Sequence, residues 1–279
     1  MKTDCAFILA AGHGTRMGDV GKVIPKPAFP VFDKTLIEVL IIQLKELGFK
    51  KIFVNAHHQA DYLKNHLAKI NSEIIVLHEE ELLGSGGAFY NLKSSFPDLK
   101  NVFSINSDLI FNLTKANFSD LERVHEETEA SATILGLNVN GGNDFNRLDV
   151  EGNFLKNIIN SSDLNAKLYD YTYSGIGIFD LERLDPNYSG KKSSFFDSVA
   201  PFKKKSVAVC LPGVLDYYDF GTIENYLKSI KMIRGDRNSF IRKFLSQEML
   251  KENRESFVYR NDQLEVTVSD KGLRLKLKT

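Results

Sequence analysis

The sequence predicts an α/β fold built on a mixed, mostly parallel β-sheet flanked by helices. In the first half of the 279-residue chain, short β-rich runs alternate with helical patterns. This alternation is typical of parallel sheets with helices on both faces. Apolar residues make up 43% of the chain, which is enough for a substantial core. The expected buried strands of this half are residues 5–9, 52–55, 74–77 and 102–105.

The clearest helix of the first half begins after Thr35. Its apolar residues recur at helical spacing, and Gly48 stands where a C-terminal cap belongs. These apolar residues are Leu36, Ile37, Leu40, Ile41, Leu44 and Leu47. The pattern predicts an amphipathic helix that covers one face of the sheet.

The second half of the chain is less regular and predicts a mixed extension of the same sheet. Segment 138–146 contains Asn-Gly-Gly-Asn, a strong turn signal. A helix is expected after residues 219–222, with Thr222 as its N-cap. The strands expected in this half are residues 130–135, 172–179 and 207–211.

The character of the sequence changes after about residue 233. Residues 238–250 resemble a helix, and residues 256–278 alternate as short strands. No hexapeptide array or other internal repeat is visible. We therefore expect a main domain at residues 1–233, followed by a small α+β extension at residues 234–279.

Charge and cysteine content limit the possible partners and compartments. Thirty-six basic residues balance thirty-six acidic ones, so no general field draws the protein to nucleic acid or to a membrane. The apolar run at residues 5–9 is too short for a membrane span and leads into glycine-rich sequence instead of a cleavage site. Cys5 and Cys210 form no metal-spaced cluster and predict two buried thiols. We expect a cytoplasmic protein in which any phosphate binding is local.

The most informative segment follows the first expected strand. Residues 9–17 read Leu-Ala-Ala-Gly-His-Gly-Thr-Arg-Met, and Pro25-Lys26-Pro27 comes shortly after them. Gly12 and Gly14 allow main-chain N–H groups to approach a phosphate closely, while Arg16 and Lys26 add positive charge. The ending of a P-loop is missing, and the spacing of a dinucleotide-binding loop is not met. The segment predicts a different kind of phosphate-binding loop.

This loop resembles the signature of the nucleotidyltransferases that activate sugar 1-phosphates. The likeness continues in the family's order over about residues 5–232. The matching segments are residues 35–38, 54–58, 83–87, 106–108, 173–177 and 219–222. The resemblance implies a Rossmann-like nucleotidyltransferase fold. Within the family, the chain is similar to enzymes for N-acetylmuramic acid 1-phosphate and to mannose or heptose guanylyltransferases.

The resemblance implies a magnesium-dependent transfer of a nucleoside monophosphate from a nucleoside triphosphate to a sugar 1-phosphate, with loss of pyrophosphate. Asp108 follows an expected strand, at the edge of the sheet where ligands bind in open α/β folds. Together with Asp219 it is expected to hold Mg²⁺. Arg16, Lys26 and Asp108 are the expected catalytic residues, and Arg16 and Lys26 neutralise the departing phosphates.

The resemblance also implies two groups of binding residues. The nucleotide is expected to contact Leu9, Ala10, Ala11, Gly12, Gly14, Thr15, Arg16, Lys26, Asn55, Ser85, Gly86, Gly87 and Asp108. The sugar is expected to contact Ser174, Gly175 and Gly177. From the residues alone, Ser85 to Gly87 fit the start of a helix equally well, and Ser174 to Gly177 fit a β-bulge almost as well.

The expected partners are UTP or GTP and a sugar 1-phosphate. Uridylyl transfer to N-acetylmuramic acid 1-phosphate is the first expectation. Guanylyl transfer to mannose or heptose 1-phosphate is the alternative, because residues 84–87 depart from the muramic-acid pattern. A phosphocholine-type cytidylyltransferase, a metal-dependent glycosyltransferase and a non-catalytic sugar-nucleotide-binding paralogue are further alternatives. A monomer or a homodimer is expected.

Overall fold

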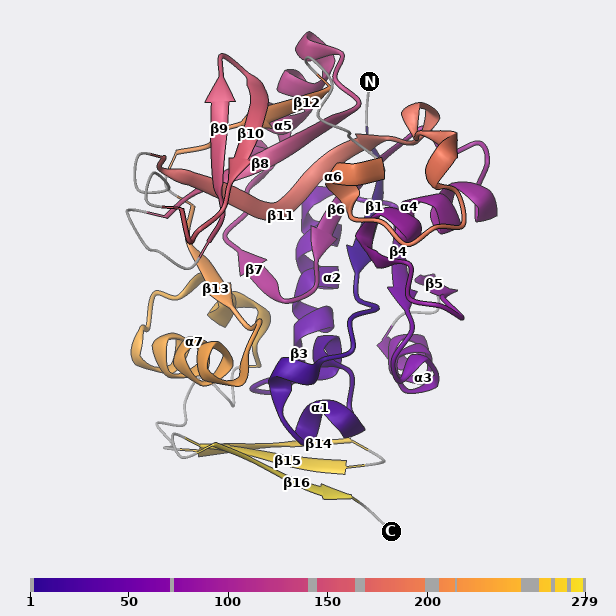
Figure 1. The fold of residues 1–279 in the computed structure, drawn as a ribbon. Helices are drawn as coiled ribbons and strands as arrows, with labels where there is room; N and C mark the ends of the chain where they lie inside the picture. Colours follow the sequence, from indigo (N-terminus) through magenta and orange to yellow (C-terminus); the bar gives the residue numbers. More distant parts are fainter. Residues whose placement is uncertain are drawn as a thin grey trace.

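The computed structural model describes residues 3–70, 73–139, 145–163, 169–198, 206–213, 215–246, 256–261, 264–269 and 272–277. A nine-stranded sheet forms the centre of this part of the chain, in the order β5-β4-β1-β6-β11-β8-β12-β10-β9 (Figure 1). Its strands are β1 (Cys5–Leu9), β4 (Lys51–Ala56), β5 (Ile75–His78), β6 (Asn101–Asn106), β8 (Ala132–Asn138), β9 (Arg147–Glu151), β10 (Phe154–Ile159), β11 (Tyr171–Asp180) and β12 (Val207–Cys210).

The strand directions confirm a mixed, mostly parallel sheet. The strands β5, β4, β1 and β6 pair in parallel, as the alternating first half of the sequence predicts. Beyond β6, the strands β11 and β10 run antiparallel to their neighbours, while β8 and β12 pair in parallel. Most residues of β1, β4 and β6 are buried, whereas the edge strand β5 is partly exposed, and the carboxyl ends of these four strands meet at one edge of the sheet.

Helices cover both faces of the sheet. One apolar cluster contains buried residues of α2 (Leu36–Leu47), α3 (Ala60–Ile70), α5 (Lys115–Thr128) and α7 (Ile223–Gly235). The opposite cluster contains residues of α4 (Gly84–Ser95) and α6 (Phe195–Ser198). Helix α2 begins at a capping box between Thr35 and Glu38 and ends at Gly48, which has a positive φ of 105°. None of the helices in the described ranges has the length and apolar character of a membrane span.

Two short antiparallel ribbons lie beside the sheet. The strands β2 (Pro30–Val31) and β3 (Lys34–Thr35) form a hairpin after the glycine loop, near the helix α1 (Val20–Val23). The strands β7 (Leu109–Phe111) and β13 (Tyr217–Asp219) pair with each other although they are far apart in sequence. The second pairing brings Asp219 beside the segment that begins at Asp108.

The C-terminal residues form a separate antiparallel sheet of three strands. These are β14 (Ser256–Arg260), β15 (Leu264–Ser269) and β16 (Gly272–Leu277). In Figure 1 this sheet lies beneath α1. Phe257 stacks on Phe32 with ring centroids 4.8 Å apart, and Asn261 donates a hydrogen bond to the Tyr62 hydroxyl. The strands expected after residue 256 are therefore present.

One expectation about helices is corrected by the structure, and one open alternative is decided. In place of an α-helix over residues 238–250, the described residues up to 246 contain a short 3-10 helix at Phe240–Phe244, whose buried residues Ile241 and Phe244 are spaced by one 3-10 turn. Residues 247–250 lie outside the described ranges. Residues 84–87 form the first turn of α4, as the helix-start alternative for this segment predicts.

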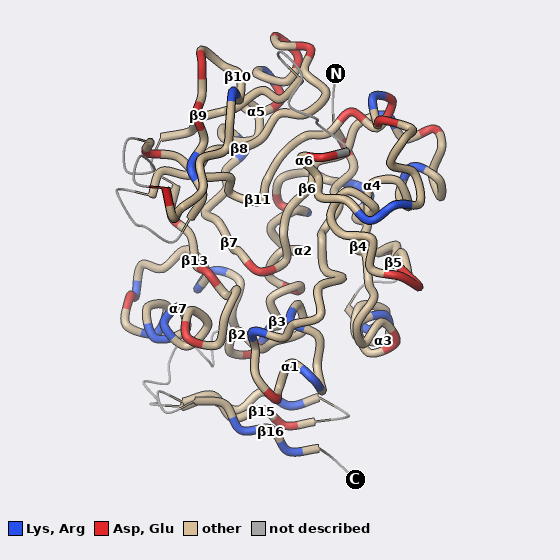
Figure 2. The backbone as a smooth tube through the Cα atoms, viewed as in Figure 1, with Lys and Arg blue, Asp and Glu red and all other residues tan. Residues whose placement is uncertain are grey.

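The cysteines and charges agree with the sequence analysis. Cys5 and Cys210 are both free and buried. Burial raises the pKa of each thiol to about 11. Figure 2 shows basic and acidic residues interspersed along the backbone, in keeping with the balanced composition.

Candidate functional site

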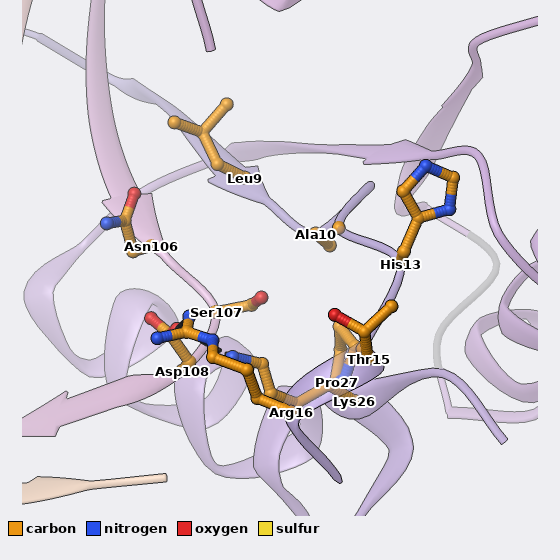
Figure 3. A pocket seen from close by; sticks show the side chains of 12 residues that line it. Leu9, Ala10, His13, Thr15, Arg16, Lys26, Pro27, Asn106, Ser107 and Asp108 are labelled. Atoms are coloured by element: carbon orange, nitrogen blue, oxygen red, sulfur yellow. Dashed lines mark hydrogen bonds and ion pairs between the residues drawn. The ribbon is translucent and has the colours of Figure 1, made fainter. Parts of the chain in front are cut away.

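A cavity of about 310 Å³ lies at the carboxyl ends of β1 and β6. These strands are neighbours in the sheet, so the loop after Leu9 and the residues after Ile105 face the same space. Figure 3 shows the side chains gathered around it. The lining residues are Leu9, Ala10, Gly12, His13, Gly14, Thr15, Arg16, Lys26, Pro27, Asn106, Ser107 and Asp108. Most of the residues that the sequence assigns to the nucleotide therefore line one cavity.

The glycine loop folds back on itself through close backbone contacts. Gly14 has a φ of 65°, which favours glycine, and its carbonyl accepts a hydrogen bond from the Met17 N–H. A Cβ at Gly21 would lie only 2.5 Å from the Gly14 oxygen. A Cβ at Gly12, in contrast, would meet nothing within 4 Å. Gly14 and Gly21 thus fix the loop, while Gly12 leaves open space at the cavity.

Asn55 supports the loop from the neighbouring strand. Its Oδ1 accepts a hydrogen bond of 2.6 Å from the Ala10 N–H, and its Nδ2 donates a hydrogen bond of 2.7 Å to Glu79 Oε1. Asn55 and Glu79 are both buried. Desolvation is the largest effect on Glu79 and raises the pKa of its carboxyl group. The sequence analysis missed Glu79, because nothing in a short run of glutamates distinguishes its buried member from its exposed ones.

Lys26 joins the loop to the carboxylate side of the cavity. Its Nζ lies 2.7 Å from Asp108 Oδ2 and also donates a hydrogen bond of 3.3 Å to the Gly221 carbonyl. Arg16 Nη2 lies 4.0 Å from the same Asp108 oxygen, but its side chain is largely exposed. Lys26 is therefore held in place, whereas Arg16 remains accessible to an incoming phosphate.

Asp108 and Asp219 approach each other across Gly221. A Cβ at Gly221 would lie 2.9 Å from Asp219 Oδ1 and 3.7 Å from Asp108 Oδ2. The Phe220 N–H donates a hydrogen bond to the Asp108 carbonyl, which ties the two segments together. Asp219 also accepts hydrogen bonds from the Gly221 N–H and from Asn225 Nδ2. Both carboxylates thus lie close to Gly221, where Asp108 lines the cavity at the glycine loop and Asp219 lines a second cavity of about 300 Å³.

Residues 5–145 match the sequence profile of the nucleotidyl transferase family. The chain belongs to this family. It is 29% identical over 143 residues to a UTP–glucose-1-phosphate uridylyltransferase of Synechocystis, covering 47% of this chain and 36% of that protein. It is 32% identical over 111 residues to the D-glycero-alpha-D-manno-heptose 1-phosphate guanylyltransferase of Campylobacter jejuni, covering 39% of this chain and 49% of that protein. The chain thus spans half or less of the length of these two relatives.

The fold is similar to that of a solved structure, HddC from Yersinia pseudotuberculosis in complex with GMP-PN. The TM-score is 0.68, with 22% sequence identity, and the match covers 82% of this chain and 99% of HddC. At this identity the likeness establishes the fold alone. The relatives include uridylyl and guanylyl enzymes, so they leave the base open.

Three further residues expected at the nucleotide lie apart from the cavity at the glycine loop. None of Ser85, Gly86 and Gly87 lines that cavity, whereas Gly87 lines a different cavity of about 520 Å³ together with Glu79. Ser85 Oγ accepts a hydrogen bond from the Phe195 N–H, and the Gly86 N–H donates one to the Ser193 carbonyl. The start of α4 therefore packs against segment 193–195, and its role with the nucleotide stays a prediction.

The three residues expected at the sugar differ in their surroundings. Ser174 is buried and donates a hydrogen bond to the Leu135 carbonyl, at a register shift between β11 and β8. A Cβ at Gly177 would meet the Thr133 carbonyl at 2.9 Å, so its glycine is needed for strand packing. Gly175 has a φ of 80°, and its Cβ would lie 2.6 Å from the amide nitrogen of Asn106, which lines the cavity. Gly175 is the member of this group next to the cavity.

A histidine group borders the loop. The His13 ring lies 5.3 Å from the ring of His57 and 6.1 Å from that of His58. His57 Nδ1 shares a hydrogen bond with the Glu79 carbonyl, and His58 Nε2 shares one with the Gly21 carbonyl. Within the described ranges, no group of three or more histidine, cysteine or acidic residues has the geometry of a metal site.

Proposed function

We propose that this chain transfers a nucleoside monophosphate from a nucleoside triphosphate to a sugar 1-phosphate. A phosphate oxygen of the sugar attacks the α-phosphorus in line, and the bond from this phosphorus to the bridging oxygen of the leaving pyrophosphate breaks. The single observation that supports this proposal most strongly is the meeting of Lys26, Asp108 and Asp219 beside the glycine loop. Because phosphate oxygen is itself a nucleophile, no covalent intermediate with the protein is required.

The residues at Gly221 fit the magnesium ion that the family implies. Two carboxylates face a space that a single Cβ would fill, and carboxylate oxygens are the ligands that Mg²⁺ prefers. Asp108 and Asp219 would hold the ion. When bound there, it supplies positive charge that polarises the α-phosphate. The Lys26 ammonium group is already held beside the Asp108 carboxylate, so it needs little reorientation when the substrate binds.

The loop residues have separate roles in this proposal. The backbone between Ala10 and Gly14 encloses the triphosphate, and Gly12 leaves room for close approach. Arg16 and Lys26 neutralise the β- and γ-phosphates as they depart. Asn55 orients the Ala10 N–H and thereby keeps the start of the loop in register with β4.

For the substrates, we propose uridylyl transfer to N-acetylmuramic acid 1-phosphate as the first candidate. Guanylyl transfer to mannose or heptose 1-phosphate is the second, and Glu79 is the observation that favours it. The Glu79 Oε2 atom is buried and has no hydrogen-bond partner among the described residues. Its Oε1 atom accepts a hydrogen bond from Asn55, which in turn contacts the glycine loop. A carboxylate accepts hydrogen bonds from N–H groups. The Watson–Crick edge of guanine has two such groups, a ring N–H and an amino group, whereas that of uracil has only a ring N–H.

A pyrophosphate-release assay tests the proposal. The four ribonucleoside triphosphates and dTTP are each combined with N-acetylmuramic acid, mannose, heptose and glucose 1-phosphates, with phosphocholine as a further acceptor. Turnover with one triphosphate and one sugar phosphate supports the enzyme. Binding without turnover supports a non-catalytic sugar-nucleotide-binding protein, and turnover only with CTP and phosphocholine supports the cytidylyltransferase alternative.

The base is tested with Glu79→Gln, whose amide can also donate a hydrogen bond. If Glu79 contacts guanine, this substitution lowers the GTP preference by about tenfold or more. Equal GTP and UTP kinetics in the variant and the parent protein exclude a role of Glu79 in base selection.

A further inference from the structure

The structure buries one arginine without a partner for two of its nitrogens. Arg147 is the first residue of β9, and only 1% of its surface is exposed. Among the described residues, neither its Nε nor its Nη1 has a hydrogen-bond partner. It is one of the largest fully buried side chains of this part of the molecule.

An arginine in this state destabilises the fold. A guanidinium group cannot lose its proton at physiological pH, so burial leaves a full charge away from water. An unpaired buried charge is strongly unfavourable, and an apolar side chain of similar length could fill the same volume. A negatively charged group that binds to the folded protein would offset this cost.

The direction of the Arg147 side chain follows from its neighbours in the hairpin. Leu148 and Val150 of β9, with Ile158 of β10, pack in the cluster that contains α4 and α6. Because side chains alternate along a strand, Arg147 extends from the opposite face, as does Ile159, with which it is paired. Arg147 therefore points away from α4 and α6.

A cavity lies between this part of the hairpin and Asp219. Phe145, two residues before Arg147, lines a space of about 300 Å³ together with Tyr217, Asp219 and Asn225. In Figure 1 the β9–β10 hairpin stands above β13 and α7, which supply these residues. The start of the hairpin therefore borders the cavity that contains Asp219, which is separate from the cavity at the glycine loop.

We propose that Arg147 binds an anionic group of the acceptor, either its 1-phosphate or a carboxylate substituent on the sugar. The planar guanidinium group matches both anions through paired N–H donors, whereas neutral sugar hydroxyls cannot offset its charge. This inference rests on the proposed function, since it assigns the acceptor of the same reaction.

The test compares Arg147→Met and Arg147→Lys with a matched control, Arg123→Met. Arg123 is exposed on α5 and pairs with Asp120 and Glu127. In Arg147→Met, the KM for the sugar phosphate rises by at least about tenfold, while the KM for the triphosphate is unchanged. The melting temperature of this variant without ligand also rises, because an unpaired buried charge has been removed. Arg147→Lys recovers part of the lost affinity, and the control changes neither KM.

Acceptors with and without a carboxylate separate the two anions. A KM increase for both N-acetylmuramic acid and N-acetylglucosamine 1-phosphates identifies the 1-phosphate, while an increase confined to the first identifies the carboxylate. The inference is overturned if Arg147→Met melts at a lower temperature and keeps the parent KM for acceptors, because the guanidinium group then has a partner within the protein.

Inorganic phosphate serves as a probe that does not depend on turnover. If phosphate raises the melting temperature of the parent protein and not of Arg147→Met, anion binding at Arg147 stands even if no sugar phosphate is a substrate. An equal shift in both proteins overturns it.

Discussion

Lys26 belongs to two parts of the site at once. It comes from the segment that follows the glycine loop, residues 18–35, which we call the arm. Its ammonium group nevertheless contacts Asp108 and the Gly221 carbonyl on the opposite side of the cavity. Only 12% of its side chain is exposed, so its charge is screened little by water. A partly buried cation at this point is well suited to neutralise a triphosphate.

Replacing Lys26 should therefore impair the reaction much more than the fold. We expect Lys26→Met to lower kcat/KM for the triphosphate by about a hundredfold or more, because a fixed charge beside the leaving group is lost. Lys22→Met is the matched control, since Lys22 lies on the same arm, is exposed and pairs only with Asp19 among the described residues. Steady-state pyrophosphate release measures both variants. Equal losses of kcat/KM in Lys26→Met and Lys22→Met would show that any change in the arm impairs the reaction and that the position of the Lys26 charge is not important.

Gly221 offers a second test at the residue scale. In Gly221→Ala the new methyl group would lie 2.9 Å from Asp219 Oδ1, in the space between the carboxylates. We expect activity to fall by about tenfold or more and the magnesium concentration for half-maximal activity to rise. Gly235→Ala is the control, because a Cβ there meets nothing within 4 Å. Unchanged magnesium dependence in Gly221→Ala would argue against an ion at this position.

At the scale of elements, the C-terminal sheet packs against the arm that holds Lys26. Phe257 of β14 stacks on Phe32, which has an unusual φ of 60° and belongs to the turn between β2 and β3. The Ser246 N–H donates to the neighbouring Asp33 carboxylate. The extension at residues 234–279 thus supports the region around the loop, although the division into two parts stays a prediction.

Truncating Phe257 tests this support. We expect Phe257→Ala to lower the free energy of unfolding by about 3 to 5 kcal/mol, because a buried aromatic ring is removed. Below the melting transition it should also raise the KM for the triphosphate. Leu277→Ala, at an exposed end of β16, should change stability by less than about 0.5 kcal/mol. Denaturant titration gives the stability change, and kinetics at a temperature where both variants are folded gives the KM.

The contact between α5 and β8 predicts a dependence of stability on pH. His125 is buried and shares a hydrogen bond of 2.9 Å with Thr133. Desolvation lowers the pKa of His125 below its ordinary value of 6.5. The unfolded chain therefore binds the proton first as pH falls. The stability from neutral His125 is present above pH 6.5 and is lost from there down toward the lowered pKa.

We expect this histidine to contribute a slope of at most about 1.4 kcal/mol per pH unit below pH 6.5. His125→Gln should reduce the difference in unfolding free energy between pH 7.5 and pH 5.5, as measured by denaturant titration at each pH. The same difference in the variant and the parent protein would assign the pH dependence to other groups.

The sequence predicts the first half of the fold better than the second. β1, β4, β5 and β6 begin and end within one residue of their expected bounds, because buried parallel strands have continuous apolar runs. Strands β9 and β10 were not predicted, since their half-exposed residues show no clear alternation. The pairing of β7 with β13 depends on contacts between distant segments, which no local pattern contains.

Some residues of the candidate site could likewise be predicted from the sequence, and others could not. Gly12, Gly14, Arg16, Lys26 and Asp108 are local signals beside a strand end, and the structure brings them to one cavity. Glu79 and Arg147 could not be predicted, because burial alone distinguishes them from ordinary charged residues. Ser174 and Gly177 were assigned to the sugar, yet their surroundings are those of sheet packing.

At the scale of the whole molecule, three chain segments meet at the edge where β1 and β6 end. The loop after β1 supplies the cations, the end of β6 supplies Asp108, and the segment after β12 returns through β13 to supply Asp219. The net charge of the chain is zero, so the attraction for a triphosphate is local to this edge. The central claim is that these segments form one site for phosphate displacement.

The most direct test is pyrophosphate release as a function of magnesium concentration in the parent protein, Asp108→Asn and Asp219→Asn. We expect the parent protein to require magnesium. The Asp108→Asn variant should lose about a thousandfold in kcat, and Asp219→Asn should need much more magnesium, with both variants folded as judged by their melting temperatures. Turnover in Asp108→Asn at the parent rate and with the parent magnesium dependence would contradict the account.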